Sequence, residues 1–461
     1  MGAAQVLAEE EGVVAGSSGR TTLVVGLGDT GLAVARYLAA DRLLVIDSRE
    51  QPPTLDALRA SRPDARVEVG SLDIKWLDQI DRVVLSPGLS SDIPLVAEAR
   101  RRGLPVLSDI ELFAEAATAP VLAVTGSNGK STVVTLVRNI LRAAGRRVLA
   151  GGNLGPPALD LLAEPEPDAY VLEVSSFQME TTQSLHAHAA AVLNISADHL
   201  DRHGSIEQYA ALKERLLASA SYGVFNWDDP MVRAMGQRHP RPVAVSVDAP
   251  LDQGFSIVEV DARRWLARDG RAIIASDELG LVGRHNEANA LVALALCLLL
   301  EADAAAEVEA AACEVLRRFR GLPHRCQQVA EKSGVVFVDD SKGTNVGASV
   351  AALQSLAAPV VLIAGGQGKR ADFAALATAA RDRLRAAVLI GEAAASLAAV
   401  LGPVCPVEMG SSMDDAVTRA ARLARPGDVV LLSPACASQD MFRDYRERGE
   451  VFVRAVLRLP A

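Results

Sequence analysis

A glycine-rich loop between two regular segments constrains the fold of this chain more than any other feature. Residues 121–124 (VLAV) predict a buried strand, residues 125–132 read TGSNGKST, and a helical pattern continues to about residue 144. The loop is two residues shorter between its glycines than the general G-x-x-x-x-G-K-[ST] pattern, but it has the same strand, loop and helix order. This order predicts an α/β sheet whose loop binds a triphosphate. Its N–H groups can cradle phosphates, Lys130 can offset their charge, and the Ser131 hydroxyl can reach Mg²⁺.

Two further predicted strands of the same block end in ionisable side chains. Residues 169–174 carry Glu173, and residues 189–195 lead into Asp198 and His199. Because ligands of parallel α/β sheets collect beyond the carboxyl ends of the strands, the loop, the carboxylate and the imidazole are expected to converge. Taken singly, Glu173 could be an edge charge and His199 a hydrogen-bonded structural residue. Their shared position at strand ends near the loop favours a site.

The first block of the chain predicts a smaller α/β domain. Residues 22–25 form an apolar strand, GLGDTG follows at 26–31, and residues 32–40 have a helical pattern. The G-x-G-x-x-G motif is complete, and Asp47 lies roughly 20 residues on, where an NAD ribose would be met. An NAD-dependent oxidoreductase therefore stays open as an alternative. Such turns also serve only for tight helix packing, or bind other phosphates.

The last block, residues 321–461, repeats the pattern. Its predicted strands are 335–338, 360–363, 387–390 and 429–432. GGQGK at 365–369 superficially resembles a phosphate loop, but no Ser or Thr follows Lys369. We interpret Lys369 as a cationic site for a carboxylate or a phosphate, and a solvated loop lysine is the alternative.

The length of 461 residues exceeds what one hydrophobic core supports and indicates about three domains. We expect an α/β protein with an N-terminal Rossmann-like domain, a central P-loop ATPase-like domain and a C-terminal Rossmann-like domain. The predicted boundaries are 21–108, 109–320 and 321–461, after a loose N-terminal tail at 1–20.

Charge and composition argue against nucleic acid and membranes as partners of this protein. A formal charge of −10 gives no diffuse attraction to nucleic acid or anionic lipid. The longest apolar run, residues 290–300, is far shorter than the roughly 20 residues that span a bilayer, so no membrane insertion is expected. The five cysteines show no C-x-x-C pair and the N-terminus lacks the features of a secretory signal. These observations predict a cytoplasmic protein, and a monomer is expected.

Nine motifs together resemble the Mur ligase family, over nearly the whole chain after the tail. They are TGSNGKST (125–132), GGNLG (151–155), LEVSSFQME (172–180), NISADHLDRHGSIEQYAALK (194–213), GRHNEANA (283–290), GLPHR (321–325), DDSKGTN (339–345), GGQGKRADF (365–373) and LSPACASQDMF (432–442). The resemblance implies that the first domain holds a UDP-sugar, the second holds ATP and Mg²⁺, and the third brings an amino acid.

The resemblance also implies roles for individual residues. ATP would contact Gly126, Ser127, Asn128, Gly129, Lys130, Ser131, Thr132, Asn286, Asn289, Arg325 and Asp340. The UDP-sugar would face Asp29, Thr30, Asp47, Ser48, Arg49, Ser86, Pro87 and Gly88, with Gly152, Asn153, Ser175 and Gln178 from the second domain. Glutamate would meet Lys342, Thr344, Lys369, Ser438 and Tyr445. The metal would be held by Ser131, Glu173, His199 and Lys213, of which the last three and Lys130 would be catalytic, with Asn194 and Asp198 nearby.

The implied activity is an ATP-dependent ligase of peptidoglycan precursor synthesis that adds D-glutamate to UDP-N-acetylmuramoyl-L-alanine through an acyl-phosphate. The motifs favour this activity over folylpolyglutamate synthase. Gln439 and Tyr445 depart from the residues usual in the family, which keeps an L-glutamate-adding variant as the alternative. A P-loop switch that hydrolyses nucleotide without ligation is a third hypothesis.

Lys213 belongs to a predicted helix. Ser205 and Gln208 form an S-x-x-Q capping box, so a helix should begin at about Ile206. Lys213 then falls on its apolar stripe, with Tyr209 as a neighbour. A lysine that extends along its stem to solvent is the simpler interpretation of the pattern. The family resemblance instead implies a buried, carbamylated lysine that helps to hold Mg²⁺.

Overall fold

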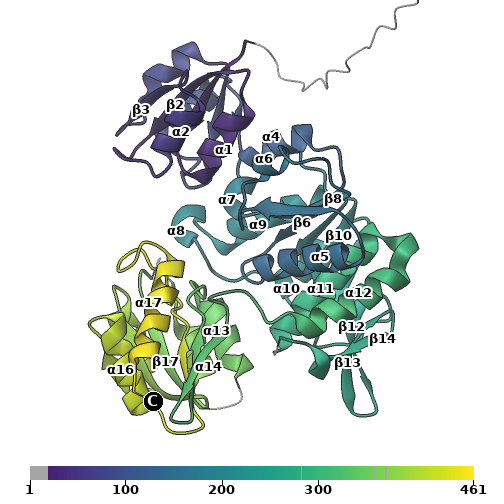
Figure 1. Ribbon diagram of the computed structural model, residues 1–461, viewed down its shortest axis with the longest axis vertical. Helices are drawn as coiled ribbons and strands as arrows, with labels where there is room; N and C mark the ends of the chain where they lie inside the picture. Colours follow the sequence, from purple (N-terminus) through teal and green to yellow (C-terminus); the bar gives the residue numbers. More distant parts are fainter. Residues whose placement is uncertain (1–18, 282, 357–358, 369–370, 461) are drawn as a thin grey trace, which may run out of the picture. The chain divides into compact units, whose positions relative to one another are not determined.

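The computed structural model describes residues 19–281, 283–356, 359–368 and 371–460, and contains three sheets flanked by helices (Figure 1). The predicted α/β class with three sheet-containing domains is confirmed. The predicted tail lies almost entirely outside the described residues. Among the described residues, no helix combines the length and the apolar composition needed to cross a membrane.

The first sheet has the parallel order β3-β2-β1-β4-β5. Its strands are β1 (Thr21–Val25), β2 (Arg42–Asp47), β3 (Arg66–Val69), β4 (Arg82–Leu85) and β5 (Val106–Leu107). Its helices are α1 (Asp29–Tyr37), α2 (Leu55–Ser61), η1 (Ile74–Gln79), α3 (Pro94–Arg101) and α4 (Asp109–Ala116). Helix α1 begins three residues before the predicted start at 32, because an acidic residue suits the first turn of a helix.

This sheet belongs to a compact unit that is discontinuous in sequence. Besides the described residues up to Ala116, the unit contains Pro157–Glu164, with helix α6 (Ala158–Leu161), and Glu180–Ser184. The carboxylate of Glu111 accepts hydrogen bonds from the main-chain N–H groups of Gln183 and Ser184. The later segments therefore complete the polar contacts of the earlier one.

The second unit contains the two other sheets. The larger has the order β14-β13-β12-β11-β10-β9-β6-β8-β7 and is parallel except at β12-β13-β14. Its strands are β6 (Val121–Thr125), β7 (Val148–Gly152), β8 (Ala169–Glu173), β9 (Ala189–Val192), β10 (Tyr222–Asn226), β11 (Pro242–Ser246), β12 (Phe255–Val260), β13 (Arg263–Arg268) and β14 (Arg271–Ala275). Its helices are α5 (Lys130–Ala143), α7 (Ser176–Met179), α8 (Leu200–His203), α9 (Ile206–Ala218), α10 (Pro230–Gly236), η2 (Ser276–Glu278), α11 (Arg284–Leu300), η3 (Ala302–Ala304) and α12 (Ala305–Arg318).

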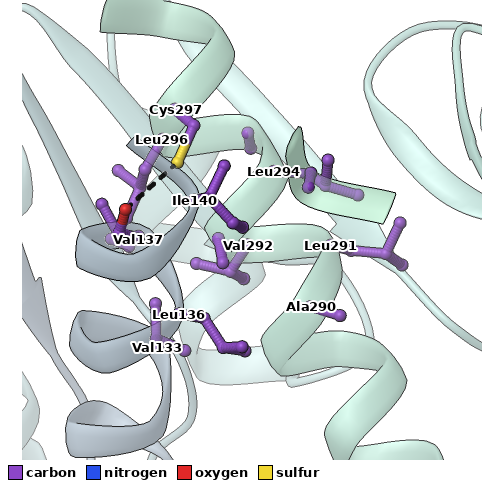
Figure 2. Close-up of a cluster of buried hydrophobic side chains, with 14 of the residues drawn as sticks. Val133, Leu136, Val137, Ile140, Ala290, Leu291, Val292, Leu294, Leu296 and Cys297 are labelled. Carbon is purple, nitrogen blue, oxygen red and sulfur yellow. Dashed lines mark hydrogen bonds between the residues drawn. The ribbon is translucent and has the colours of Figure 1, made fainter. Parts of the chain in front are cut away.

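Helices cover both faces of this sheet, because alternate strand residues point in opposite directions. On one face, α5 and α11 pack against each other and the sheet (Figure 2). Val133, Val137 and Ile140 of α5 meet Val292 and Leu296 of α11 there, and the Cys297 thiol lies 3.8 Å from the Val137 carbonyl oxygen. On the other face, α9 and α10 share a smaller core with β9 and β10. These helices fix the phosphate loop and Lys213 to one sheet.

The third sheet has the order β15-β16-β20-β17-β18-β19, with only β15 antiparallel to its neighbour. Its strands are β15 (Gln327–Lys332), β16 (Val335–Asp339), β17 (Val360–Gly365), β18 (Leu384–Ile390), β19 (Val407–Met409) and β20 (Val429–Leu432). Its helices are α13 (Val346–Ser355), α14 (Ala374–Ala380), α15 (Ala394–Leu401), α16 (Met413–Leu423) and α17 (Tyr445–Arg458). The four predicted strands all form here. The exact domain boundaries stay predictions.

Candidate functional site

The TGSNGKST segment forms the turn between β6 and α5, as predicted. Gly126 and Gly129 have φ angles of 145° and 88°. A Cβ atom on Gly129 would lie 2.5 Å from the Asn289 side-chain oxygen, and one on Gly126 would lie 2.9 Å from Leu193 Cβ. Both positions therefore require glycine for conformation and for space.

Lys130 begins helix α5, and its side chain folds back over the loop. Its Nζ donates hydrogen bonds to the carbonyl oxygens of Gly126 (2.8 Å) and Ser127 (2.9 Å). Burial lowers the pKa of this ammonium group, although the carboxylates of Glu173 and Asp198 oppose the shift. The lysine is held at the phosphate loop by main-chain oxygens, where an anionic ligand can compete for it.

Glu173 ends strand β8 and is 3% exposed. Its Oε2 accepts a hydrogen bond from Ser131 Oγ (2.5 Å), and its Oε1 accepts one from Asn153 Nδ2 (2.6 Å). Arg325 Nη2 donates to the same Ser131 hydroxyl at 2.7 Å. Burial acts to raise the pKa of Glu173, but the Lys130 charge and these hydrogen bonds outweigh it, so the pKa lies below its usual range. Glu173 is therefore an ionised, buried carboxylate beside the phosphate loop.

The helix that carries Lys213 begins where the capping box predicts. Helix α9 starts at Ile206, and the Ser205 hydroxyl accepts a hydrogen bond from the Gln208 N–H group. Lys213 is 1% exposed, so the expectation from the helix pattern alone, a lysine that reaches solvent, is wrong. Lys213 belongs to the buried side of α9, together with Tyr209, Ala210, Leu216 and Leu217.

The amine of Lys213 lies against the phosphate loop. Its Nζ donates to the Gly126 carbonyl oxygen (3.0 Å) and to Thr125 Oγ1 (3.3 Å), and it lies 4.4 Å from the centre of the Tyr209 ring. Burial, and then the charge of Lys130, lowers the pKa of Lys213 well below its usual value. The sequence therefore brings two lysines of weakened basicity to one loop.

Asp198 and His199 lie in the segment after β9, which ends at Val192, three residues before the predicted end at 195. His199 has a φ of 53°, and its Nε2 lies 3.6 Å from Asp198 Oδ2. The ring also packs edge-on against Phe177, with 4.7 Å between centroids. Asp198 and His199 line a small cavity of about 20 Å³ together with Thr344. Aspartate, imidazole and one predicted glutamate contact are thus neighbours.

Asparagine side chains connect these loops, and the sequence prediction missed one of them. Asn194 Oδ1 accepts from the Asn128 N–H group (2.8 Å). Asn345 Nδ2 donates to Asp198 Oδ2 (3.0 Å), and its amide group lies 3.2 Å from that of Asn128. Asn345 also caps helix α13, because its Oδ1 accepts from the Ala348 N–H group. Its place at the end of the DDSKGTN motif was the available signal, but the sequence analysis assigned it no role.

A cavity of about 510 Å³ opens beside the phosphate loop. The predicted ATP residues on its lining are Asn128, Gly129, Thr132, Asn286, Asn289, Arg325 and Asp340. Asp340 Oδ2 accepts from Ser433 Oγ (2.6 Å), and burial raises the pKa of Asp340 to about 7. The structure therefore brings the loop and these distant predicted residues around one space large enough for a nucleotide.

The predicted glutamate residues are partly described. Lys342 also borders the large cavity, and its Nζ lies 4.1 Å from the centre of the Tyr445 ring. Burial, with the charges of Arg325 and Lys130, lowers the pKa of Lys342 to about 8. Ser438 is 2% exposed. Lys369 lies outside the described residues.

The predicted UDP-sugar residues divide between the two units. In the first unit, Asp47 holds the glycine turn, because its Oδ2 accepts from the Leu27 N–H group (2.7 Å) and from Arg49 Nη2 (2.7 Å). Its Oδ1 accepts from the N–H group and the Nε of Arg49. The dinucleotide alternative loses its main support here, since these donors already occupy the carboxylate that would meet a ribose.

The other residues of this set lie at loop and helix ends. Ser48, Ser86, Pro87 and Gly88 follow strands β2 and β4, and Asp29 and Thr30 open helix α1. In the second unit, Gly152 ends β7, where a Cβ atom would lie 2.4 Å from the Glu173 carbonyl oxygen. Ser175 and Gln178 share a hydrogen bond of 3.0 Å between Oγ and Oε1. Each unit thus presents its part of the set at the carboxyl ends of its strands.

The fold and the site together define an α/β protein with a P-loop nucleotide site. Three family models match it in order: Mur ligase MurD-like, N-terminal domain (residues 20–108), Mur ligase middle domain (124–297) and Mur ligase, glutamate ligase domain (324–436). The chain belongs to the Mur ligase family.

Similar proteins cover nearly the whole chain. A UDP-N-acetylmuramoylalanine--D-glutamate ligase of Nitrosococcus oceani is 46% identical, over 95% of this chain and 96% of the relative. A protein of the same name from Methylobacillus flagellatus is 48% identical, over the same shares. Among solved structures, the UDP-N-acetylmuramate-alanine ligase MurC of Thermotoga maritima is similar with a TM-score of 0.62 and 18% identity, over 95% of this chain and 99% of that one. The last similarity concerns the fold alone.

Proposed function

We propose that this protein is an ATP-dependent ligase that joins D-glutamate to UDP-N-acetylmuramoyl-L-alanine in peptidoglycan precursor synthesis. The observation that carries the proposal is the similarity over 95% of the chain to relatives named for this reaction. The convergence of the phosphate loop, Glu173 and Lys213 supports it, because a nucleotide-driven reaction needs those groups in one place.

ATP binding is proposed for the cavity beside the phosphate loop. The triphosphate lies over the N–H groups at the start of α5, where a helix N-terminus favours negative charge. Lys130 exchanges its main-chain acceptors for phosphate oxygens. Asn286 and Asn289 offer amide groups to the base, and Arg325 and Asp340 face the ribose and phosphates. The family resemblance assigns these roles.

Mg²⁺ is the proposed metal. Mg²⁺ prefers oxygen ligands and usually binds through one or two carboxylates together with substrate phosphates. Ser131 and Glu173 supply such oxygens side by side. Among the described residues, no group of three or more His, Cys, Asp or Glu side chains is arranged to hold a metal. When bound, the ion neutralises phosphate charge, and His199 and a modified Lys213 complete the protein's ligand set.

The proposed chemistry has two displacements. A carboxylate oxygen of the terminal alanine bonds to the γ-phosphorus of ATP as the bond to ADP breaks, which gives an acyl-phosphate. The glutamate amine nitrogen then bonds to the carbonyl carbon, phosphate leaves, and the nitrogen loses a proton. Lys130 compensates for charge in the first displacement, and Lys342 lies where it can attract the incoming carboxylates.

Lys213 is proposed to act as a carbamate. Since its pKa lies well below its usual value, the neutral amine is available to attack CO₂ and lose a proton. The product bears one negative charge and can hold Mg²⁺, whereas a cationic lysine cannot. The position of the amine, beside Gly126 of the phosphate loop, suits this role.

Glutamate is proposed to bind Lys342, Thr344, Lys369, Ser438 and Tyr445, and the UDP-sugar to bind the residue sets described above from residues 21–108 and from the central domain. A domain division at 108/109 and 320/321, a monomeric state and a cytoplasmic location complete the proposal. The D-configuration follows the printed names of the relatives. The alternative is the L-glutamate-adding variant, because Gln439 and Tyr445 differ from the residues usual in the family.

One experiment tests the proposal. The purified protein is incubated with ATP, UDP-N-acetylmuramoyl-L-alanine and each glutamate enantiomer, and the products are identified by mass spectrometry and chiral chromatography. A glutamyl adduct with the D-enantiomer, equimolar with ADP and phosphate, is expected. An adduct with the L-enantiomer alone would support the variant, and no adduct with either would refute the ligase. Phosphate release that is independent of both substrates would indicate a nucleotide switch.

A further inference from the structure

Arg448 is a buried arginine on the first turns of helix α17, outside every role proposed above. It is 1% exposed. Its Nε and Nη2 donate to Ser341 Oγ (3.0 Å) and to the Ser341 carbonyl oxygen (2.8 Å). Its Nη1 donates to the carbonyl oxygens of Cys436 (3.1 Å) and Ala437 (3.2 Å). One planar guanidinium therefore joins two loops that are almost 100 residues apart in sequence.

These two loops carry the proposed glutamate contacts. Ser341 precedes Lys342 directly, and Ala437 precedes Ser438 directly. The loop after β17 is tied to the same place, because Gln367 and Ala437 exchange two main-chain hydrogen bonds of 3.0 Å. That loop leads to Lys369, which lies outside the described residues.

Neighbouring glycines show how closely the elements meet around the guanidinium. A Cβ atom on Gly449 would lie 2.2 Å from His324 Nδ1 and 2.8 Å from Asp339 Oδ2. A Cβ atom on Gly366 would lie 2.2 Å from the Ala437 carbonyl oxygen and 3.2 Å from Arg448 Nη1. Helix α17 can therefore insert Arg448 between the loops only because these positions lack side chains.

The acceptors of Arg448 are neutral oxygens, which compensate a buried charge less well than a carboxylate does. The pKa of Arg448 is lowered by burial to about 10, so the group stays charged at neutral pH. Its hydrogen bonds therefore do not form an ion pair. They hold main-chain atoms of Ser341 at a fixed distance from those of Cys436–Ala437.

We propose that Arg448 is a positioning residue for the amino-acid substrate, which keeps the Lys342–Thr344 loop and the Ser438 loop in the relative arrangement that receives glutamate. The inference rests on the proposed ligase function. It also assigns Ser341 a role as the acceptor through which the arginine acts on Lys342. The hydrogen bonds of Arg448 reach Ser341, Cys436 and Ala437, directly beside the proposed glutamate contacts Lys342 and Ser438, so its loss should affect glutamate binding more than ATP binding.

The test compares Michaelis constants in three variants. R448K keeps the charge but loses the planar guanidinium, and R448M loses both. S341A removes the side-chain acceptor of Nε, together with the hydrogen bond that Ser341 Oγ donates to the Tyr445 carbonyl oxygen (2.8 Å). We expect the KM for glutamate to rise about tenfold or more in R448K and further in R448M, with kcat reduced less and the KM for ATP nearly unchanged. S341A should show the same selectivity with a smaller rise.

A buried arginine elsewhere supplies the matched control. Arg62 in the first unit donates to the carbonyl oxygens of Ala35, Leu38 and Asp41, also pairs with the Asp64 carboxylate, and is 7% exposed. R62M should lower thermal stability without a selective change in the KM for glutamate.

Each outcome decides between the two proposals. Equal rises in the constants for all substrates, or a loss of activity that only follows the folded fraction, would overturn the positioning role. If R448K and R448M do not fold, S341A decides, and an unchanged KM for glutamate in S341A refutes the proposal. A wild-type protein that forms no adduct at all would refute the ligase function instead.

Discussion

Two glycine turns in this molecule have the same design and different surroundings. The turn between β1 and α1 and the turn between β6 and α5 both connect a buried parallel strand to a helix. In the first, the Asp47 carboxylate binds the turn itself through the Leu27 N–H group. In the second, Lys130 and Lys213 both donate to the Gly126 carbonyl oxygen. Glycines therefore set the shape of such a turn, and the charged residues from other elements set its chemistry.

The two turns also differ in how many buried ionisable groups surround them. Two buried amines and the ionised Glu173 surround the second turn. Burial lowers the pKa of both amines, and the charge of Lys130 lowers that of Lys213 further. Such crowding destabilises an empty site and favours a polyanionic ligand. The first turn has its charges already paired, since Arg49 neutralises Asp47.

The largest expected effect concerns the second turn. Lys130→Met should reduce kcat by about 10³-fold, because the ammonium group compensates charge that develops on the transferred phosphoryl group. The melting temperature without ligand should change far less than kcat, because Lys130 donates hydrogen bonds to its own loop and Glu173, which loses a compensating charge, keeps its donors Ser131 and Asn153. Steady-state kinetics and a thermal melt measure both. Near-normal turnover would remove the distinction between the two turns.

Lys213→Ala should abolish ligation nearly as completely, and short carboxylates should restore part of it. The substitution leaves a space at the Gly126 carbonyl in which formate or acetate can supply the oxygen ligands of the lost carbamate. Activity is measured against carboxylate concentration, with chloride as the control anion. An intact mass that shows unmodified Lys213 in active protein, together with no rescue, would contradict the carbamate.

Substitutions in the first turn should change the free energy of unfolding of the first unit. A Cβ atom on Gly31 would lie 2.1 Å from the Gly26 carbonyl oxygen, so Gly31→Ala should cost about 3 kcal/mol through overpacking. Gly28 is the matched control, because a Cβ atom there meets nothing within 4 Å and its φ is −104°. Gly28→Ala should lower the free energy of unfolding by only about 1 kcal/mol, because Gly28 is the N-cap of α1, where alanine is less favourable than glycine.

Urea unfolding can follow this unit alone. The chain has three tryptophans, Trp76, Trp227 and Trp265, and only Trp76 lies in the first unit. With the other two replaced by phenylalanine, its fluorescence reports the first unit. ATP binding should be retained in both glycine variants. Equal stabilities of Gly31→Ala and Gly28→Ala would show that the first turn is not closely packed.

The smallest expected effect concerns Lys342, whose pKa is lowered in part by the charge of Lys130 at the second turn. The pKa of Lys342 is about 8, below its usual 10.5, so its amine is protonated at pH 7 and largely neutral at about pH 9. If its charge attracts glutamate, the KM for glutamate should rise several-fold between these values. Lys342→Arg should remove the rise, because arginine stays charged. Titration of glutamate itself affects both proteins equally, so a rise of the same size in the variant would exclude Lys342 as its source.

Much of the fold could be predicted because its signals are local. Apolar runs gave the strands, and the Ser205 capping box gave the start of α9. The end of β9 could not be predicted in this way. Leu193 and Asn194 look like strand residues, but Asn194 turns to bind the phosphate loop through its carbonyl and side-chain oxygens. The strand ends there because Asn194 bonds to the phosphate loop, and the sequence around residue 194 does not show that contact.

The sequence predicted the motifs of the site, but not the contacts between residues that are distant in sequence. The burial of Lys213 depends on packing from β6 and Tyr209, so the helix pattern alone indicated the wrong environment. Arg448 belongs to none of the motifs, and the sequence analysis assigned it no role. Its contacts with Ser341 and Cys436 arise because β16 and β20 are neighbours in the sheet, and that adjacency is a property of the topology.

The discontinuous first unit has a consequence for how the chain is made. All five strands of its sheet have been synthesised by Leu107, yet the N–H groups that bind Glu111 come from Gln183 and Ser184, more than 70 residues later. Ser108 likewise waits for its hydroxyl partner Thr182. On the ribosome, where domains usually fold in order from the N-terminus, this unit cannot be finished before much of the next has emerged. A gene fragment that stops at residue 116 would therefore encode an incomplete unit, with a carboxylate that has lost its native donors.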